Sequence, residues 1–130
     1  MLKLLVIDET KKLILECEHC TERFFKMREE DRAPHFFEEV KPHADQIHGL
    51  LHSWKANANE WIKQNRPKYM HPQQIASTVE AMDQFVVQSF YKETSKKRFI
   101  QSVQSTSYTL NTFLHYLEEG EHDVVEKADD

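Results

Sequence analysis

The chain has 130 residues, of which 30% are charged and 39% are hydrophobic, and its formal net charge is −5. This composition is that of a soluble globular protein, and the length suits one domain that folds without disulfides or a structural metal. Only two residues are glycine, far below the usual proportion of about 7%. Strands and tight turns usually need more glycine than this, so helices are favoured.

The negative charge is concentrated at the C-terminal end. Residues 118–130 hold seven acidic residues and one lysine, so residues 1–117 carry a net charge of +1. A body this close to neutral gives no electrostatic basis for binding nucleic acid, which requires a strongly basic face. We expect a folded domain over residues 1–120 and an acidic, disordered tail over residues 121–130, because the tail lacks apolar periodicity.

The first predicted element is a long helix. The chain opens with an apolar run over residues 2–7, too short for the apolar region of a signal peptide or for a membrane span. We therefore expect no membrane contact and a cytoplasmic location, where both cysteines would stay reduced. Apolar and small residues then recur at alternating steps of three and four, which predicts a buried seam of Ile7, Thr10, Ile14, Cys17, Thr21 and Phe24.

Three further seams follow the first. They consist of Ile47, Leu51, Trp54, Ala58 and Trp61, then Ile75, Val79, Met82, Val86 and Ser89, and finally Phe99, Val103, Thr106, Leu110, Phe113 and Leu117. Each seam has the spacing of a helix that packs into a bundle. The four prolines fall between the seams or at their ends, at Pro34, Pro42, Pro67 and Pro72.

Prolines, helix-capping residues and a glycine predict where the helices begin and end. Lys41-Pro42 and His71-Pro72 are typical of helix starts, Thr94 or Ser95 can cap the fourth helix, and Gly120 can end it. The short connections force neighbouring helices to run antiparallel. The sequence therefore predicts an all-α protein, an antiparallel up-down-up-down four-helix bundle. The stretch from Pro34 to Val40, with Phe36 and Phe37, is expected to add a short helical turn that plugs one end.

One set of residues keeps a distinctive mutual spacing between residue 36 and about residue 117: Phe36-Phe37, Lys41-Pro42, Trp54, Arg66-Pro67-Lys68-Tyr69, His71, Gln74-Ile75, Gln88-Ser89, Lys96-Lys97-Arg98-Phe99, Ser105 and Tyr108-Thr109-Leu110. In these positions the chain resembles a known family, the YppE-like small proteins of Bacillus and related bacteria. The first helix matches in its periodicity alone. The resemblance implies a compact helical bundle and assigns neither a biochemical function nor catalytic residues.

Cys17 and Cys20 are three residues apart, with His19 between them. A redox-active C-x-x-C pair sits at a helix N-terminus, where the dipole stabilises the thiolate, but this pair falls in mid-helix. A structural zinc site needs two more ligands, and the sequence offers no second cysteine pair. We favour core packing for both thiols, with metal binding and redox sensing as the alternatives.

Two other patterns are compatible with metal sites. His48 and His52 have the i, i+4 spacing that allows two imidazoles to share an ion, although a solvated helix flank explains them equally well. A di-iron centre needs two inward-facing Glu-x-x-His pairs and two more glutamates. Glu16 with His19 fits the first part of this pattern, but both fall off the predicted seam, and no glutamate lies on any seam. We therefore expect no cofactor.

The most distinctive connection runs from Arg66 to His71. Arg66, Lys68, Tyr69 and His71 place two cations, a phenol and an imidazole at one end of the bundle, which is enough to hold an anion or a partner's carboxylate. The same residues also fit a plain interhelix turn, and we favour that interpretation.

No nucleophile stands in a recognisable motif, and no glycine loop could hold a phosphate. The sequence thus leans away from an enzyme. We expect a cytoplasmic module that binds another protein through a helix face or the Arg66–His71 end, with a small-ligand or metal-binding bundle as the alternative.

Overall fold

A computed structural model describes the backbone of residues 1–129 and the side chains of residues 1–119. The chain forms four α-helices and one turn of π-helix, namely α1 (Leu2–Glu30), η1 (Phe36–Val40), α2 (Lys41–Asn65), α3 (Pro72–Gln88) and α4 (Lys96–Asp129). Over residues 1–129 there are no strands. The all-α class predicted from the sequence is confirmed.

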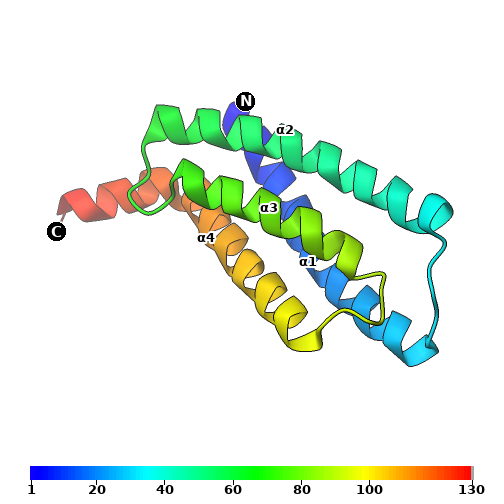
Figure 1. The fold of residues 1–130 in the computed structure, drawn as a ribbon. Coiled ribbons are helices and arrows are strands. Elements are labelled where there is room, and N and C mark those ends of the chain that lie inside the picture. Colours follow the sequence, from blue (N-terminus) through cyan, green and yellow to red (C-terminus); the bar gives the residue numbers. More distant parts are fainter. Residues whose placement is uncertain (130) are drawn as a thin grey trace.

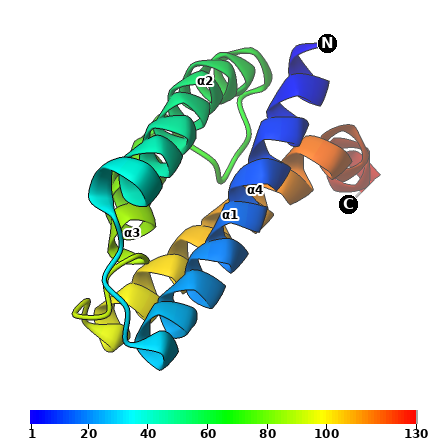
Figure 2. The same ribbon diagram turned by 90° about the vertical axis from the view of Figure 1, so that its right-hand side faces the viewer.

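The four helices form two antiparallel pairs. Figure 1 shows that α2 and α3 lie side by side, and Figure 2 shows the same for α1 and α4. α1 also packs against α2, and α3 against α4, so α1 and α3 face each other across the bundle. Successive helices run in opposite directions (Figure 1), which is the predicted up-down-up-down bundle. Among the described helices, none combines the length and the apolar content needed to cross a bilayer.

The core is apolar and rich in aromatic rings. Trp54, Phe24, Phe85, Phe99 and Phe113 are fully buried, and the rings of Phe24 and Phe99 stack with centroids 4.4 Å apart. Every residue of the second, third and fourth predicted seams is buried, so those three helix faces were predicted correctly. Interleaved seams of this kind bury a continuous apolar surface, which is the main contribution to the stability of a helical bundle.

The predicted face of α1 is only partly correct. Thr10, Cys17 and Phe24 are buried as expected, whereas the other three seam residues, Ile7, Ile14 and Thr21, lie at the edge of the core. Because α1 contacts both α2 and α4, its buried arc is wider than one seam. It includes the apolar Val6, Leu13, Cys20 and Met27 and two carboxylates, those of Glu9 and Glu16. The prediction that every glutamate lies off the buried faces is therefore wrong.

The helix starts follow the prolines, as predicted, since Pro72 is the first residue of α3 and Pro42 lies in the first turn of α2. The Thr94 hydroxyl donates to the carbonyl of Gln88 at 2.9 Å, so this side chain satisfies the end of α3. The backbone of α4 stays helical through Gly120 to Asp129, so the helix does not end at the glycine. The side chains of residues 121–130 lie outside the described part, and the disordered tail stays a prediction.

The connection between α1 and α2 contains the expected extra turn, but its aromatic rings point outward. Val40 is fully buried, while Phe36 is 47% exposed and Phe37 is 77% exposed. The expected turn is therefore present, and it buries Val40 while its two aromatic rings face solvent. The connection is braced by Arg32, whose guanidinium donates to both oxygens of Glu39 at 2.7 and 3.0 Å.

Candidate functional site

The loop residues selected from the sequence build a turn between α2 and α3. Arg66 ends α2 in the left-handed conformation (φ 48°), and its backbone N–H donates to the carbonyl of Ile62 at 2.8 Å. The ammonium of Lys68 lies 5.3 Å from the centre of the Tyr69 ring. His71 precedes α3, and its backbone N–H donates to the Gln74 side chain at 2.7 Å. Among the described side chains, neither Arg66 nor Lys68 forms an ion pair. Binding of an anion by this loop stays a prediction.

The two thiols are buried and protonated. Burial raises the pKa of Cys17 to about 12, and the charges of Glu16 and Glu18 act in the same direction. Burial also raises the pKa of Cys20, whose thiol lies 3.4 Å from Glu16 Oε2. A thiol in this state is a weak nucleophile and a poor metal ligand, because both reactions need the thiolate.

His48 and His52 lie close together on α2, with ring centroids 4.3 Å apart. His48 Nδ1 is 3.1 Å from Asp83 Oδ1 on α3, so the first imidazole bridges two helices at the surface. Over residues 1–119, no three His, Cys, Asp or Glu side chains are arranged to hold a metal ion. The metal-binding alternative, for this pair and for Cys17 and Cys20, therefore gains no support.

A buried polar cluster connects α1, α2 and the end of α3. Glu16, only 4% exposed, places Oε2 at 2.8 Å from His43 Nε2 and at 3.5 Å from Arg23 Nη1. The same guanidinium donates to the Ser89 hydroxyl at 2.8 Å and lies 4.5 Å from the centre of the Phe90 ring. These contacts pair Glu16 Oε2 with groups on α1 and α2, and Arg23 joins the cluster to the end of α3.

A second buried carboxylate lies two turns earlier on α1. Glu9 is 4% exposed and accepts hydrogen bonds from the Ser53 hydroxyl and, at 2.9 Å, from the Asn57 amide on α2. Beside it, the Trp54 indole N–H donates to the Thr10 hydroxyl at 2.9 Å. A seven-residue repeat of polar residues, Glu9, Glu16 and Arg23, is the sequence signal that could have revealed this polar face.

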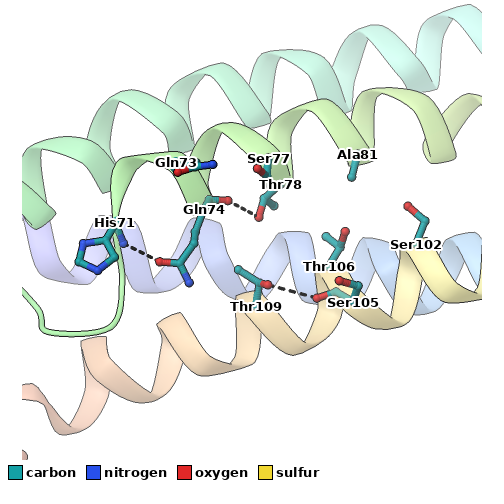
Figure 3. A pocket seen from close by; sticks show the side chains of 10 residues that line it. All are labelled: His71, Gln73, Gln74, Ser77, Thr78, Ala81, Ser102, Ser105, Thr106 and Thr109. Atoms are coloured by element: carbon teal, nitrogen blue, oxygen red, sulfur yellow. Dashed lines mark hydrogen bonds between the residues drawn. The ribbon is translucent and has the colours of Figure 1, made fainter.

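A groove of about 380 Å³ runs between α3 and α4, with His71 at one end and Ala81 and Ser102 at the other (Figure 3). Its walls carry small hydroxyl side chains, and none of its 10 lining residues is Asp, Glu, Lys or Arg. Small side chains on facing helices leave this space open. Of the residues singled out in the Arg66–His71 loop, only His71 lines the groove. The groove itself was not predicted from the sequence.

A profile of the bacterial domain of unknown function DUF1798 matches residues 10–117. The chain belongs to the DUF1798 family. It is 32% identical over 111 residues to the uncharacterized protein YppE of Bacillus subtilis strain 168, a match that covers 85% of this chain and 90% of YppE. The YppE-like resemblance noted in the sequence is thus confirmed.

Solved structures of this family share the fold. The crystal structure of YppE from Bacillus subtilis superposes with a TM-score of 0.86 at 30% identity, covering 95% of this chain and 99% of YppE. A protein of unknown function from Listeria innocua gives a TM-score of 0.87 at 25% identity, covering 93% of this chain and 97% of that one. A DUF1798 domain from Staphylococcus aureus gives 0.79 at 25% identity, covering 86% and 95%. These relatives support the fold and carry no activity over to this chain.

Proposed function

We propose that this DUF1798 protein is a non-enzymatic module that binds another protein, and that Phe36 and Phe37 are its main contact. The observation that carries the proposal is the exposure of these two adjacent rings, 47% and 77%, on one short turn. Their centroids lie 5.1 Å apart in an edge-to-face arrangement. Aromatic residues are enriched in protein interfaces and supply much of their binding energy.

The turn that carries the aromatic pair is held in place before any partner arrives. Val40 anchors its end in the core, and the carboxylate of Glu39 accepts from Arg32 and, at 3.1 Å, from the backbone N–H of His35. η1 also continues directly into α2. A pre-ordered turn loses little conformational entropy on binding, so more of the contact energy appears as affinity.

The non-enzymatic part of the proposal is supported by the state of the reactive groups. The thiols of Cys17 and Cys20 are buried with raised pKa values, and Oε2 of the buried Glu16 carboxylate is paired with His43 and Arg23. An active site instead needs a nucleophile or an acid–base pair that can reach a substrate. We place the module in the cytoplasm, where its two thiols would stay reduced.

The proposal is tested by comparing partner capture by three proteins. The double substitution Phe36→Ser and Phe37→Ser removes the aromatic pair, and Tyr108→Ser removes an equally exposed ring, 72% exposed, from α4. Each protein is immobilised and exposed to lysate of the native cells, and retained proteins are quantified by mass spectrometry. We expect the wild type and the Tyr108 variant to retain the same partner protein. The amount of that partner retained by the double variant should be at least tenfold lower. Equal retention by all three would reject the aromatic contact.

The Arg66–His71 loop is tested as the competing contact in the same assay. The variant Arg66→Ala with Lys68→Ala removes both loop cations, which form no ion pair among the described residues. If the loop were the contact, this variant would lose the partner, and moderate salt would weaken retention by the wild type. We expect retention by the loop variant to equal that of the wild type and to persist in salt, as it should for an aromatic contact.

A further inference from the structure

A row of exposed side chains runs along α4 on the side opposite the core, and we call it the outer face of α4. Its residues recur at steps of three and four and are all exposed: Lys97, Gln101, Gln104, Tyr108, Asn111, His115 and Glu119. Such steps place side chains on one face of a helix. α4 packs against α1 and α3 and lies across the bundle from α2 (Figure 1), so this face is turned away from the rest of the molecule.

Charged residues occupy only the two ends of the outer face. Lys97 lies at one end and Glu119 at the other, each eleven residues from Tyr108. Between these two ends the face contains no Asp, Glu, Lys or Arg. Tyr108, at the centre, is 72% exposed. A centre that lacks charge and contains tyrosine, surrounded by a polar rim, is the distribution found in protein–protein interfaces.

The cations at the start of α4 lie where the helix itself does not favour them. Lys96, Lys97 and Arg98 are the first three residues of α4, and its first turn contains no acidic residue. The N-terminal end of a helix is the positive end of its dipole, so cations there are repelled. The ammonium of Lys96 lies over the Phe25 ring, whereas Lys97 and Arg98 form no ion pair with any described residue. A carboxylate from outside the chain would relieve this repulsion.

A second copy of the chain supplies that carboxylate by symmetry. When two α4 helices pair antiparallel about a two-fold axis at Tyr108, position 97 of each copy lies opposite position 119 of the other. Packed helices lie about 8–10 Å apart, a separation that long Lys and Glu side chains span. A parallel pairing would instead place Lys97 beside Lys97 and Glu119 beside Glu119. The charges therefore select the antiparallel arrangement.

We propose that this protein forms an antiparallel homodimer through the outer face of α4, with Tyr108 at the two-fold axis and reciprocal Lys97–Glu119 ion pairs at the two ends. Because both ion pairs lie at an exposed rim, the dimer should weaken as the salt concentration rises. The aromatic pair lies on a different element, η1, which packs against α2, so this inference is independent of the function proposed above.

The test measures the mass of the full chain by sedimentation equilibrium in about 50 mM salt, where exposed charges still interact. We expect the mass to rise with protein concentration from 15.5 kDa toward twice that value. Lys97→Glu and Glu119→Lys each place like charges opposite each other at both ends and should weaken the dimer at least about tenfold. Tyr108→Ser should also weaken it. Lys55→Glu, at an exposed position of α2, changes the net charge as Lys97→Glu does and should leave the Kd within about twofold.

Mixing the two charge-reversal variants is the decisive measurement. A heterodimer of the Lys97→Glu and Glu119→Lys chains has opposite charges at both ends. The mixture should therefore dimerise about as tightly as the wild type, although neither variant does so alone. The double variant, which carries both substitutions in one chain, restores both ion pairs within a homodimer and should also dimerise. Thermal unfolding confirms that each variant folds.

Four results would overturn the proposal. A monomer mass up to about 1 mM protein would exclude the dimer. A dimer that neither reversal weakens would place the contact on another face. A mixture and a double variant that both stay monomeric, while the wild type dimerises, would exclude the antiparallel arrangement. A wild type that stays monomeric, with a protein in the capture assay that Lys97→Glu no longer retains, would assign the outer face to a different partner.

Discussion

Replacing Glu16 with alanine should lower the free energy of unfolding by about 2–4 kcal/mol. Removing one member of a fully buried ion pair costs about 3–5 kcal/mol, because the remaining charge stays buried without a partner. Here the carboxylate is 4% exposed but the side chains of Arg23 and His43 are 19% and 27% exposed, so water can partly replace it and the cost is lower. For a domain of this size the loss corresponds to a fall of about 6–20 °C in Tm.

The matched control is Glu18→Ala, two residues away on the same helix and exposed. Both substitutions change helix propensity and net charge identically. The difference between their free energies of unfolding therefore measures the contribution of the buried cluster around Glu16. We expect Glu18→Ala to stay within about 0.5 kcal/mol of the wild type, as surface substitutions do. Urea unfolding followed by far-UV circular dichroism measures both values. Equal midpoints and slopes for the two variants would refute the reasoning, since they would show that the Glu16 contacts contribute nothing net.

Four further outcomes follow from the structure. Cys17 should react slowly with a thiol reagent at pH 8 in the folded protein and fully in denaturant, and fast labelling of the native state would contradict its burial. Arg66→Gly should raise stability by up to about 1 kcal/mol in thermal unfolding, because glycine adopts the left-handed conformation without strain. Arg32 holds the pKa of Glu39 at about 2, below the ordinary 4.5. The pair therefore stabilises the fold fully above pH 4.5, and this stabilisation is lost as the pH falls toward 2. Glu39→Gln should flatten the pH dependence of the unfolding midpoint over that range. Deleting the residues after Gly120 should shift Tm by less than about 3 °C, and a fall of ten degrees would show that the tail docks.

Hydrophobic periodicity predicted the helices well wherever the buried face was apolar. Large apolar residues such as Trp54, Met82 and Phe113 identify the buried faces of α2, α3 and α4. A helix turns its large apolar side chains toward the core, so their spacing determines which face is buried. The same rule failed on α1, where Glu9 and Glu16 are buried. A carboxylate is buried only when donors from another helix reach it, and those donors are distant in sequence.

The surface features could not be derived in the same way. The exposure of Phe36 and Phe37 was not predicted, because whether an aromatic ring finds room in the core depends on the shape of the neighbouring helix ends. The α3–α4 groove arises from small side chains such as Ser77 and Ser105 that face each other across two helices, and no local pattern encodes that pairing. The Arg66–His71 loop was located correctly as a turn, while its binding capacity stays a prediction.

The most direct measurement of the central claim is site-specific photo-crosslinking in living cells. Benzoylphenylalanine placed at position 37 keeps the exposed aromatic character of Phe37, and the same residue at position 108 serves as the control on α4. If the aromatic pair is the contact with a partner protein, illumination should produce a discrete, higher-mass adduct with that partner from position 37 and no adduct with it from position 108. The absence of an adduct at position 37, or the same adducts from both positions, would contradict the claim.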